Sequence, residues 1–535
     1  MTQTLRAADI LAQRLYAAGC RRAFGMPGGE VLTLIDALER AGITFILCKH
    51  ENAGGFMAEG GHHVDGAPAI LVATVGPGAV NGVNVVANAE QDRVPMIVLT
   101  GCVDAHDAEI YTHQVLDHRA VFAPITKATF TLSAQAADVI TDKALGIALE
   151  GRAGPVHIDV PISVADAPSE DRGGYRPAAS AVALADVNPI VHALSSASKP
   201  ILMVGLDAVR EDISADVLAF VERFNIPVVT TYKAKGIVPE DHPLCLGGAG
   251  LSPLADQTLL PLFEHADFVL CLGYDPIEMR TGWQNPWDPT RQMVVDIGHA
   301  PNHHYMHQAS VNIVGDLGPT LHALMAAAPA QTWSEGQITD ARAQLAQDFD
   351  RSDDWGAVAV IDAVRTAAPK GTIATVDSGA HRILLSQTWA CDGPRQLLQS
   401  TGLCTMGCAM PLAFGVKIAA PEANVIAFMG DAGFLMVTGE LATAAEMGLP
   451  VVMVVFVDRS LALIEKKQRA RQMPNLGVDF GHHDYAAIAR AFGGNGVTVA
   501  NREDLMAAVT DGLAQTQTFT LIAAEIERQS YDGRF

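Results

Sequence analysis

Two aspartates each follow a run of apolar residues: Asp431 comes after residues 425–429, and Asp458 comes after residues 451–457. Residues 440–445 between them have a helical pattern, so the segment predicts a strand–helix–strand unit. In an open parallel sheet both aspartates then lie at the carboxyl edge, where ligands bind. Carboxylate oxygens suit Mg²⁺, and Gly430 and Gly433 let the backbone approach a phosphate. On spacing alone, the alternative that both aspartates cap helices stays open.

A third acidic residue, Glu51, follows the short apolar run 43–48 and precedes a segment rich in glycine and alanine. Its simpler interpretation is a carboxylate in the first turn of a helix. Turn-forming residues also follow two neighbouring apolar runs, Pro27 and Gly28 in one case and Gly76 in the other. The N-terminal part of the chain therefore offers a second set of polar strand ends.

The elements that must position these residues are parallel sheets. The chain has 535 residues, of which 49% are hydrophobic and 18% charged, and this length predicts about three domains. Apolar runs alternate with helical patterns throughout, which is typical of parallel strands buried on both faces. We expect an α/β fold of three doubly wound domains at 1–170, 190–330 and 357–535, with linkers at 165–190 and 331–356.

Charge and hydropathy exclude several classes of protein. The net charge of −23 disfavours nucleic-acid binding, because phosphate contacts need clustered Lys and Arg. No apolar run is long enough to cross a membrane, and the first residues lack the core of a signal peptide. The eight cysteines are scattered, several in apolar runs, which suits reduced thiols in a cytoplasmic protein.

The segment from Gly430-Asp431-Ala432 to Asp458-Arg459-Ser460 resembles the motif of thiamine diphosphate enzymes. The resemblance implies that Asp431, Asp458 and the carbonyl of Ser460 bind Mg²⁺ and, through it, the cofactor diphosphate. One departure is Val457, which stands where the family usually has Asn. The ligand position itself keeps an oxygen donor.

Further motifs resemble the acetolactate synthase group of that family. They are residues 24–29, 50–52, 76–79, 111–117, 377–381 and 400–407. In that group the glutamate at position 51 hydrogen-bonds N1′ of the cofactor pyrimidine, a glutamine at position 114 lines the active site, and Met406 props the cofactor in a V shape. Glu51, Gln114 and Met406 are therefore the expected catalytic residues. Met406 has ordinary core packing as its plain alternative.

The same resemblance implies a larger set of cofactor contacts from both ends of the chain, in which Cys404 replaces a usual glycine. The expected cofactor-binding residues are Pro27, Gly28, Glu51, Gly76, Gly379, Ala380, His381, Cys404, Met406, Gly430, Asp431, Ala432, Gly433, Leu463 and Ile464.

The central part of the chain gives conflicting signals about FAD. Residues 273–278 resemble the flavin-independent, catabolic acetolactate synthases, whereas residues 280–282 resemble the flavin-containing biosynthetic branch. Residues 205–208 lack the glycine run expected of a flavin site. This favours an enzyme without FAD.

The resemblance implies a cytoplasmic carboligase that decarboxylates pyruvate and condenses it to 2-acetolactate, active as a homodimer or homotetramer with active sites between subunits. A related 2-oxo acid decarboxylase or lyase, or a carboligase with another acceptor, is the alternative. A non-catalytic regulatory protein of the same fold is disfavoured because Glu51 and Asp431 are present. Lys467 stands where biosynthetic synthases carry a Trp. It lies either on a solvated helix face or in the acceptor pocket, where it would favour an anionic acceptor.

Overall fold

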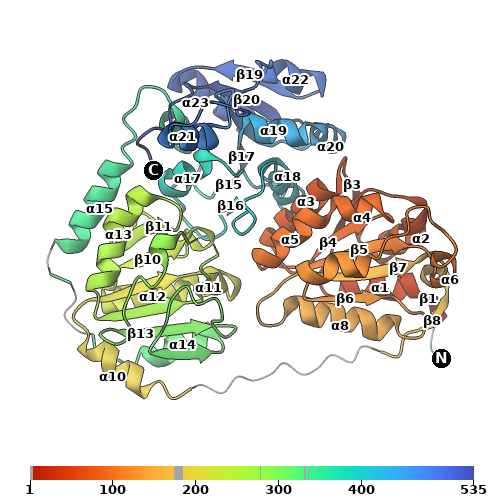
Figure 1. The fold of residues 1–535 in the computed structure, drawn as a ribbon, viewed down its shortest axis with the longest axis horizontal. Helices are drawn as coiled ribbons and strands as arrows, with labels where there is room; N and C mark the ends of the chain where they lie inside the picture. The colour runs from red at the N-terminus through yellow and green to blue at the C-terminus, as the bar shows by residue number, and fades with distance from the viewer. Residues whose placement is uncertain (1–3, 174–184, 278, 330–332, 335) are drawn as a thin grey trace.

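In this computed structural model, residues 4–173, 185–277, 279–329, 333–334 and 336–535 are described. The chain forms three six-stranded sheets, and every strand in each of them is parallel to its neighbours. Helices flank each sheet, and the third domain lies across the first and second (Figure 1). This is the expected α/β class with three doubly wound domains. The exact domain limits stay a prediction.

The first sheet is built from the N-terminal part of the chain, and its central strands are buried along their whole length. Its strands in spatial order are β3 (Thr44–Leu47), β2 (Arg22–Gly25), β4 (Ala69–Ala73), β5 (Met96–Cys102), β7 (Val156–Pro161) and β6 (Ala128–Thr131). Its helices are α1 (Ala7–Ala17), α2 (Leu32–Ala41), α3 (Glu51–Asp65), α4 (Pro77–Asn81), α5 (Val83–Gln91), α6 (Ala105–Ala108), α7 (His118–Phe122), α8 (Ala137–Leu149) and α9 (Ile162–Asp166).

The first part of the linker expected at 165–190 is a strand of the first domain. β8 (Pro168–Glu170) pairs antiparallel with β1 (Thr4–Arg6), so this part is tied to the first domain. Residues 174–184 of the expected linker lie outside the described residues. A short strand with this composition carries no hydrophobic run, which is why its pairing could not be seen in the sequence.

The central sheet has the strand order that is common in dinucleotide-binding proteins. Its strands in spatial order are β11 (Cys245–Ala249), β10 (Val228–Thr231), β9 (Pro200–Val204), β12 (Phe268–Leu272), β13 (Met293–Gly298) and β14 (Val311–Val314). Its helices are α10 (Asn188–Ser196), α11 (Leu206–Arg210), α12 (Ser214–Phe224), α13 (Pro253–His265) and α14 (Leu317–Leu324), and α15 (Gln337–Asp348) follows in the second expected linker.

The third sheet contains the strands that carry Asp431 and Asp458. In spatial order they are β16 (Leu397–Gln399), β15 (Ile373–Val376), β17 (Val425–Gly430), β18 (Val452–Val457), β20 (Thr520–Glu525) and β19 (Asn495–Val499). Its helices are α16 (Ala357–Ala367), α17 (Ala380–Thr388), α18 (Ala409–Ala419), α19 (Asp431–Val437), α20 (Leu441–Met447), α21 (Ala462–Ala470), α22 (Tyr485–Ala491) and α23 (Arg502–Leu513).

The first and third domains are joined by a close helix crossing, α3 against α18 (Figure 1). Two glycines make it possible. A Cβ on Gly60 would lie 2.2 Å from the carbonyl oxygen of Leu412, and one on Gly415 would lie 1.9 Å from that of Met57. One hydrophobic core runs through this contact from the first sheet to the third. The two domains therefore pack as one body.

Among the described residues, no helix combines the length and apolar character that a membrane crossing requires.

Candidate active site

A cavity on the third domain lies at the carboxyl edge of its sheet. The loops after β15, β17 and β18 surround a cavity of about 150 Å³. The sheet order reverses between β15 and β17, which is where open α/β sheets bind ligands. The lining residues are Ser378, Gly379, Ala380, His381, Met406, Gly430, Asp431, Ala432, Gly433, Asp458, Ser460, Leu461, Ala462, Leu463, Ile464 and Tyr531.

Asp431 and Asp458 both face this cavity, as the sequence predicts. Oδ2 of Asp431 accepts the backbone N–H of Arg459 at 2.8 Å, and Oδ1 of Asp458 accepts that of Ser460 at 3.0 Å. Burial raises the pKa of Asp431 to about 6. Burial, and then the charge of Asp431, raises the pKa of Asp458 to about 8. A buried and a half-buried carboxylate side by side without a neutralising cation are unfavourable, so their chemistry fits a divalent metal.

The loop after β18 donates a backbone hydrogen bond to Asp431. Arg459 has a φ of 60°, in the left-handed region that a residue with a side chain rarely adopts. This conformation aims its backbone N–H at Asp431. Such strain persists where the surroundings over-determine it, and it is common at functional sites. Within the described residues no group of three His, Cys, Asp or Glu side chains could hold a metal. A metal here would need carbonyl, water or phosphate oxygens as well.

His381 is the residue best placed to contact an anion. It lies in the first turn of α17, its ring stacks on Phe456, and its Nε2 atom is buried without a hydrogen-bond partner. Burial, reinforced by the charge of Arg382, lowers the pKa of His381 to about 3. The imidazole is therefore neutral and carries a single N–H. The ring also makes a hydrogen bond to the backbone of Asp377, so donation from Nε2 would exchange that partner for the ligand. A buried polar atom with no partner calls for a ligand, and a phosphate oxygen at this helix N-terminus fits.

Met406, Leu463 and Ile464 form an apolar wall on the same cavity. Cys404 does not line it: this residue has a φ of 54°, and its Sγ lies 3.1 Å from the carbonyl oxygen of Thr401. Among the expected cofactor contacts of the third domain, Cys404 is thus the one placed away from the cavity.

Two functional candidates were missed in the sequence. The carboxylate of Asp377 accepts the backbone N–H groups of residues 407–409 at 2.6–3.1 Å, and a Cβ on Gly433 would lie 1.9 Å from its Oδ2. It therefore ties the end of β15 to the start of α18. Tyr531, near the C-terminus, lines the cavity. Asp377 follows a buried strand, which was a usable signal, whereas Tyr531 lies in no motif.

The remaining predicted residues gather at the carboxyl edge of the first sheet. Glu51 is the first residue of α3 and is 4% exposed, and its Oε2 accepts a hydrogen bond from Asn81 at 3.0 Å. A Cβ on Gly78 would lie 3.0 Å from Glu51 Oε1, and one on Gly76 would lie 3.2 Å from the carbonyl oxygen of Gln114. Gly76 and Gln114 have φ values of 66° and 57°.

Pro27 and Gly28 follow β2 at the same edge, where the order of the first sheet reverses between β2 and β4. Pro27, Gly28, Glu51, Gly76 and Gln114 are absent from the described lining of the cavity beside Asp431. Within one chain the predicted residues thus lie in two separate groups, one on each sheet, which are called half-sites below.

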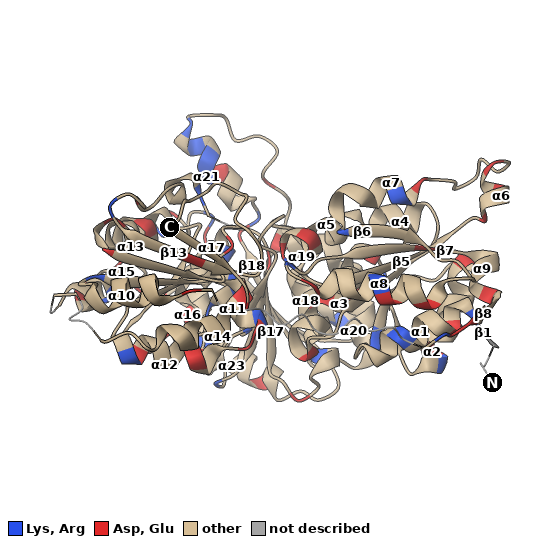
Figure 2. Cartoon of the chain, turned by 90° about the horizontal axis from the view of Figure 1, so that it is seen from below, with Lys and Arg blue, Asp and Glu red and all other residues tan. Residues whose placement is uncertain are grey.

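Lys467 is exposed on α21 and does not line the cavity. Lys466 points back to the body instead, with Nζ 4.0 Å from the ring centre of Phe535. Figure 2 shows Lys and Arg gathered on α21, at the periphery of the molecule. This position favours the solvated-face interpretation of Lys467.

Three models of known protein families match this chain, one in each domain. Residues 5–121 match the N-terminal TPP binding domain of thiamine pyrophosphate enzymes, residues 187–324 the central domain, and residues 377–524 the C-terminal TPP binding domain. Thiamine pyrophosphate is the same compound as thiamine diphosphate.

Individual relatives are named as acetolactate synthases. The probable acetolactate synthase large subunit of Methanocaldococcus jannaschii is 30% identical, over 97% of this chain and 91% of the relative. The acetolactate synthase of Bacillus subtilis is 28% identical, over 95% and 91%. The isozyme 1 large subunit of Escherichia coli is 29% identical, over 94% and 91%. The chain therefore belongs to the thiamine diphosphate-dependent enzymes, in the family of the acetolactate synthases.

Proposed function

We propose that this enzyme decarboxylates pyruvate and condenses the product with a second pyruvate to give 2-acetolactate. The observation that carries the proposal is the carboxylate pair of buried Asp431 and half-buried Asp458, beside the unpartnered Nε2 of His381. That arrangement suits a metal-bound diphosphate. A related 2-oxo acid decarboxylase, or a carboligase with another acceptor, is the alternative.

In this proposal the third domain binds the diphosphate end of the cofactor. Asp431, Asp458 and the carbonyl of Ser460 would hold Mg²⁺, and His381 would donate its N–H to a phosphate oxygen. Gly433, packed against Asp377, would let the backbone come close. Bound thiamine diphosphate supplies the electron sink that decarboxylation of a 2-oxo acid needs.

The first domain would act on the other end of the cofactor. Glu51 would hold a proton at N1′ of the pyrimidine, and Gln114 would orient the substrate. Met406, Leu463 and Ile464 would keep the two rings in place and exclude water from the reacting carbon.

Because the two half-sites are separate in one chain, we propose that two chains form each active site. Glu51 of one chain would serve Asp431 of another. Exposed apolar side chains next to both half-sites support an interface: Met436 of α19 is 65% exposed, and Ile110 and Tyr111 of the first domain are 67% and 60% exposed. A homodimer is the smallest assembly that this allows, and a homotetramer is compatible with it.

We also propose that FAD is not required. At the point where the order of the central sheet reverses, between β9 and β12, the backbones of two loops are in contact. A Cβ on Gly205 would lie 2.2 Å from the carbonyl oxygen of Gly273 and 2.6 Å from Cα of Tyr274. This supports a closed crevice where a dinucleotide would otherwise bind.

The test is a panel of 2-oxo acids supplied with thiamine diphosphate and Mg²⁺, with products identified by mass spectrometry. 2-Acetolactate from pyruvate alone is the expected product. Acetaldehyde as the main product would instead indicate a decarboxylase. A condensation product that forms only with a second, anionic carbonyl compound would indicate a different acceptor.

The two-chain site has its own test. Glu51→Gln and Asp431→Ala subunits are each expected to be inactive. Mixed by co-expression, they should recover about a quarter of the wild-type activity, because each mixed dimer contains one intact site. A mixture no more active than its parents would contradict the shared site.

A further inference from the structure

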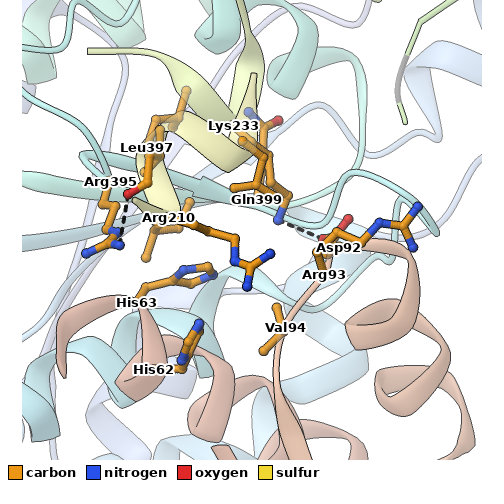
Figure 3. Close-up of a pocket in the computed structure, with 13 residues that line it drawn as sticks. His62, His63, Asp92, Arg93, Val94, Arg210, Lys233, Arg395, Leu397 and Gln399 are labelled. Carbon is orange, nitrogen blue, oxygen red and sulfur yellow. Dashed lines mark hydrogen bonds and ion pairs between the residues drawn. The ribbon is translucent and has the colours of Figure 1, made fainter. Parts of the chain in front are cut away.

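A second cavity lies where all three domains meet, away from the site beside Asp431. It measures about 40 Å³, which is room for a few water molecules and too little for a nucleotide. Figure 3 shows its side chains converging from α3, from the loop before β5, from the central domain and from the segment that enters β16. The charged and imidazole residues are His62, His63, Asp92, Arg93, Arg210, Lys233 and Arg395.

Cations outnumber carboxylates in this lining by four to one, although the chain as a whole carries a net charge of −23. The single carboxylate, Asp92, is already neutralised. It pairs with Lys233 at 2.9 Å and accepts the backbone N–H groups of Thr401 and Gly402 at 3.0 Å and 2.8 Å. Lys233 and these donors hold the pKa of Asp92 below its ordinary value, against the effect of burial.

The arginines have unequal partners. Arg93 pairs with Asp275 at 3.0 Å, outside the cavity lining. Arg210 and Arg395 donate to backbone carbonyl oxygens, of Gly151 and Val209, each at 3.2 Å. The carboxylate of Asp207 is 3.6 Å from Arg210, which is a loose ion pair. Burial lowers the pKa of Arg210, so this guanidinium is held at an electrostatic cost.

The two histidines add no charge. Burial lowers the pKa of His62 and of His63 to about 3 in each case, and for His63 the cations Lys233 and Arg395 lower it further. His62 Nδ1 lies 2.8 Å from the carbonyl oxygen of Ala67. His63 Nε2 lies 3.4 Å from Oε1 of Glu59, whose pKa is raised to about 8 by burial. The positive charge in the cavity therefore rests on Arg210 and Arg395, and the neutral imidazoles can still form hydrogen bonds.

We propose that this three-domain cavity binds a tetrahedral oxyanion: sulfate, inorganic phosphate, or the phosphate group of a small metabolite. Its size fits one such group. Arg210 and Arg395 provide the planar donors that recognise these oxygens. Because they belong to the central and third domains and His63 belongs to the first, the bound anion would connect the three domains. It would therefore stabilise their arrangement by mass action.

The test uses the holoenzyme saturated with thiamine diphosphate and Mg²⁺, so that the diphosphate site is already filled. Sulfate is titrated by calorimetry at constant ionic strength, with chloride as the comparison. We expect one saturable site per chain and a matching rise in melting temperature. Arg210→Met and Arg395→Met should each weaken binding roughly tenfold to a hundredfold, the effect of losing one charge-assisted hydrogen bond.

The matched control is Arg291→Met, since Arg291 lies in the central domain with its side chain 69% exposed. It should bind sulfate like the wild type. Repeating the titration with phosphate and with glycerol 3-phosphate separates a site for the free ion from one for a phosphomonoester. The proposal is overturned if wild-type holoenzyme shows no saturable sulfate binding. It is also overturned if both arginine variants bind as tightly as the control. Either result would leave the cluster as an ion-pair network between domains.

Discussion

The first and third sheets share one strand order and carry different chemistry. In each domain the strands, numbered along the chain, lie in the order second, first, third, fourth, sixth, fifth. The third sheet places the paired carboxylates of Asp431 and Asp458 and an unpartnered histidine at its carboxyl edge. The first sheet places Glu51 among glycines at the same edge. The same strand order thus presents different side chains at the same edge, because the loops that follow the strands differ.

The central sheet completes the comparison. It has the order third, second, first, fourth, fifth, sixth, which elsewhere opens a crevice for dinucleotides. Here the backbone of Gly205 closely approaches that of Gly273 and Tyr274 at the reversal point. Topology alone therefore does not identify a ligand, and each site has to be argued from its side chains.

The largest effect should come from removing the carboxylate that distinguishes the third sheet. Asp431→Ala should weaken Mg²⁺-dependent cofactor binding by about 3 to 5 kcal/mol, as expected for breaking a buried charge pair. The fold should persist, because a buried carboxylate with a raised pKa contributes little to stability. Calorimetry with thiamine diphosphate measures it, and Asp511→Ala, an exposed aspartate of the same domain, is the control. Undiminished binding by the Asp431 variant would refute the assignment.

The corresponding change on the first sheet should separate binding from catalysis. Glu51→Gln should retain cofactor affinity and lower the rate by roughly 10² to 10⁴, the typical contribution of a positioned acid–base group. Exchange of the cofactor C2 proton for deuterium, followed by NMR, reports this step directly. Glu150→Gln, an exposed carboxylate of the same domain, should exchange like the wild type. Normal exchange in the Glu51 variant would remove its proposed role.

The contact that joins the two sheets should be sensitive to one methyl group. Gly415→Ala places a Cβ against the carbonyl of Met57, and such overpacking should lower the free energy of unfolding by about 1 to 3 kcal/mol. Gly146→Ala in α8, where no atom lies within 4 Å of the new Cβ, should instead raise it by about 0.4 to 1 kcal/mol. Urea titration compares them. Equal shifts in the free energy of unfolding of both variants would mean that α3 and α18 can move enough to accommodate the added methyl group.

The stability of the metal-free third domain should also depend on pH, through Asp458 and Asp431. The folded-state pKa of Asp458, about 8, and of Asp431, about 6, exceed the ordinary value. The folded protein therefore holds these protons more tightly than the unfolded chain. Unfolding free energy should fall as pH rises from about 4 to 8, by at most about 1.4 kcal/mol per pH unit and proton. Asp458→Asn should flatten this slope; an unchanged slope would place its origin elsewhere.

The smallest expected effect concerns Lys467. Since this residue is exposed on α21, Lys467→Met should change kcat/KM by less than about threefold for every substrate, under ~0.7 kcal/mol. A selective loss above about tenfold with one anionic acceptor would place Lys467 in a pocket completed by the partner chain.

The sequence predicted the buried central strands of the sheets more accurately than the short strands at their edges. Buried strands such as β17 and β18 were predicted to within one residue of their observed limits, because an unbroken apolar run bounded by Pro or Gly has few alternatives. The edge strand β16 and the ribbon of β1 with β8 were missed, because three-residue strands carry no periodicity.

The candidate site shows the same limit. Motif residues such as Asp431, His381 and Met406 were predicted and do line one cavity. Tyr531 joins the cavity from the chain end, more than 70 residues after Asp458, and no local pattern indicates a contact between segments so far apart. The three-domain cavity was likewise invisible, since its cations come from separate segments of the chain.

The close contact of α3 and α18 at Gly60 and Gly415 is a point about which α3 could tilt. Glu51 stands at one end of α3, nine residues before Gly60, or about 13 Å along the helix axis at ~1.5 Å per residue. Tilting α3 by only about 5° about the crossing would swing Glu51 through ~1 Å, a displacement that can cost on the order of 100-fold in rate. Substitutions at this remote contact would therefore change the catalytic rate in small steps, without touching any ligand.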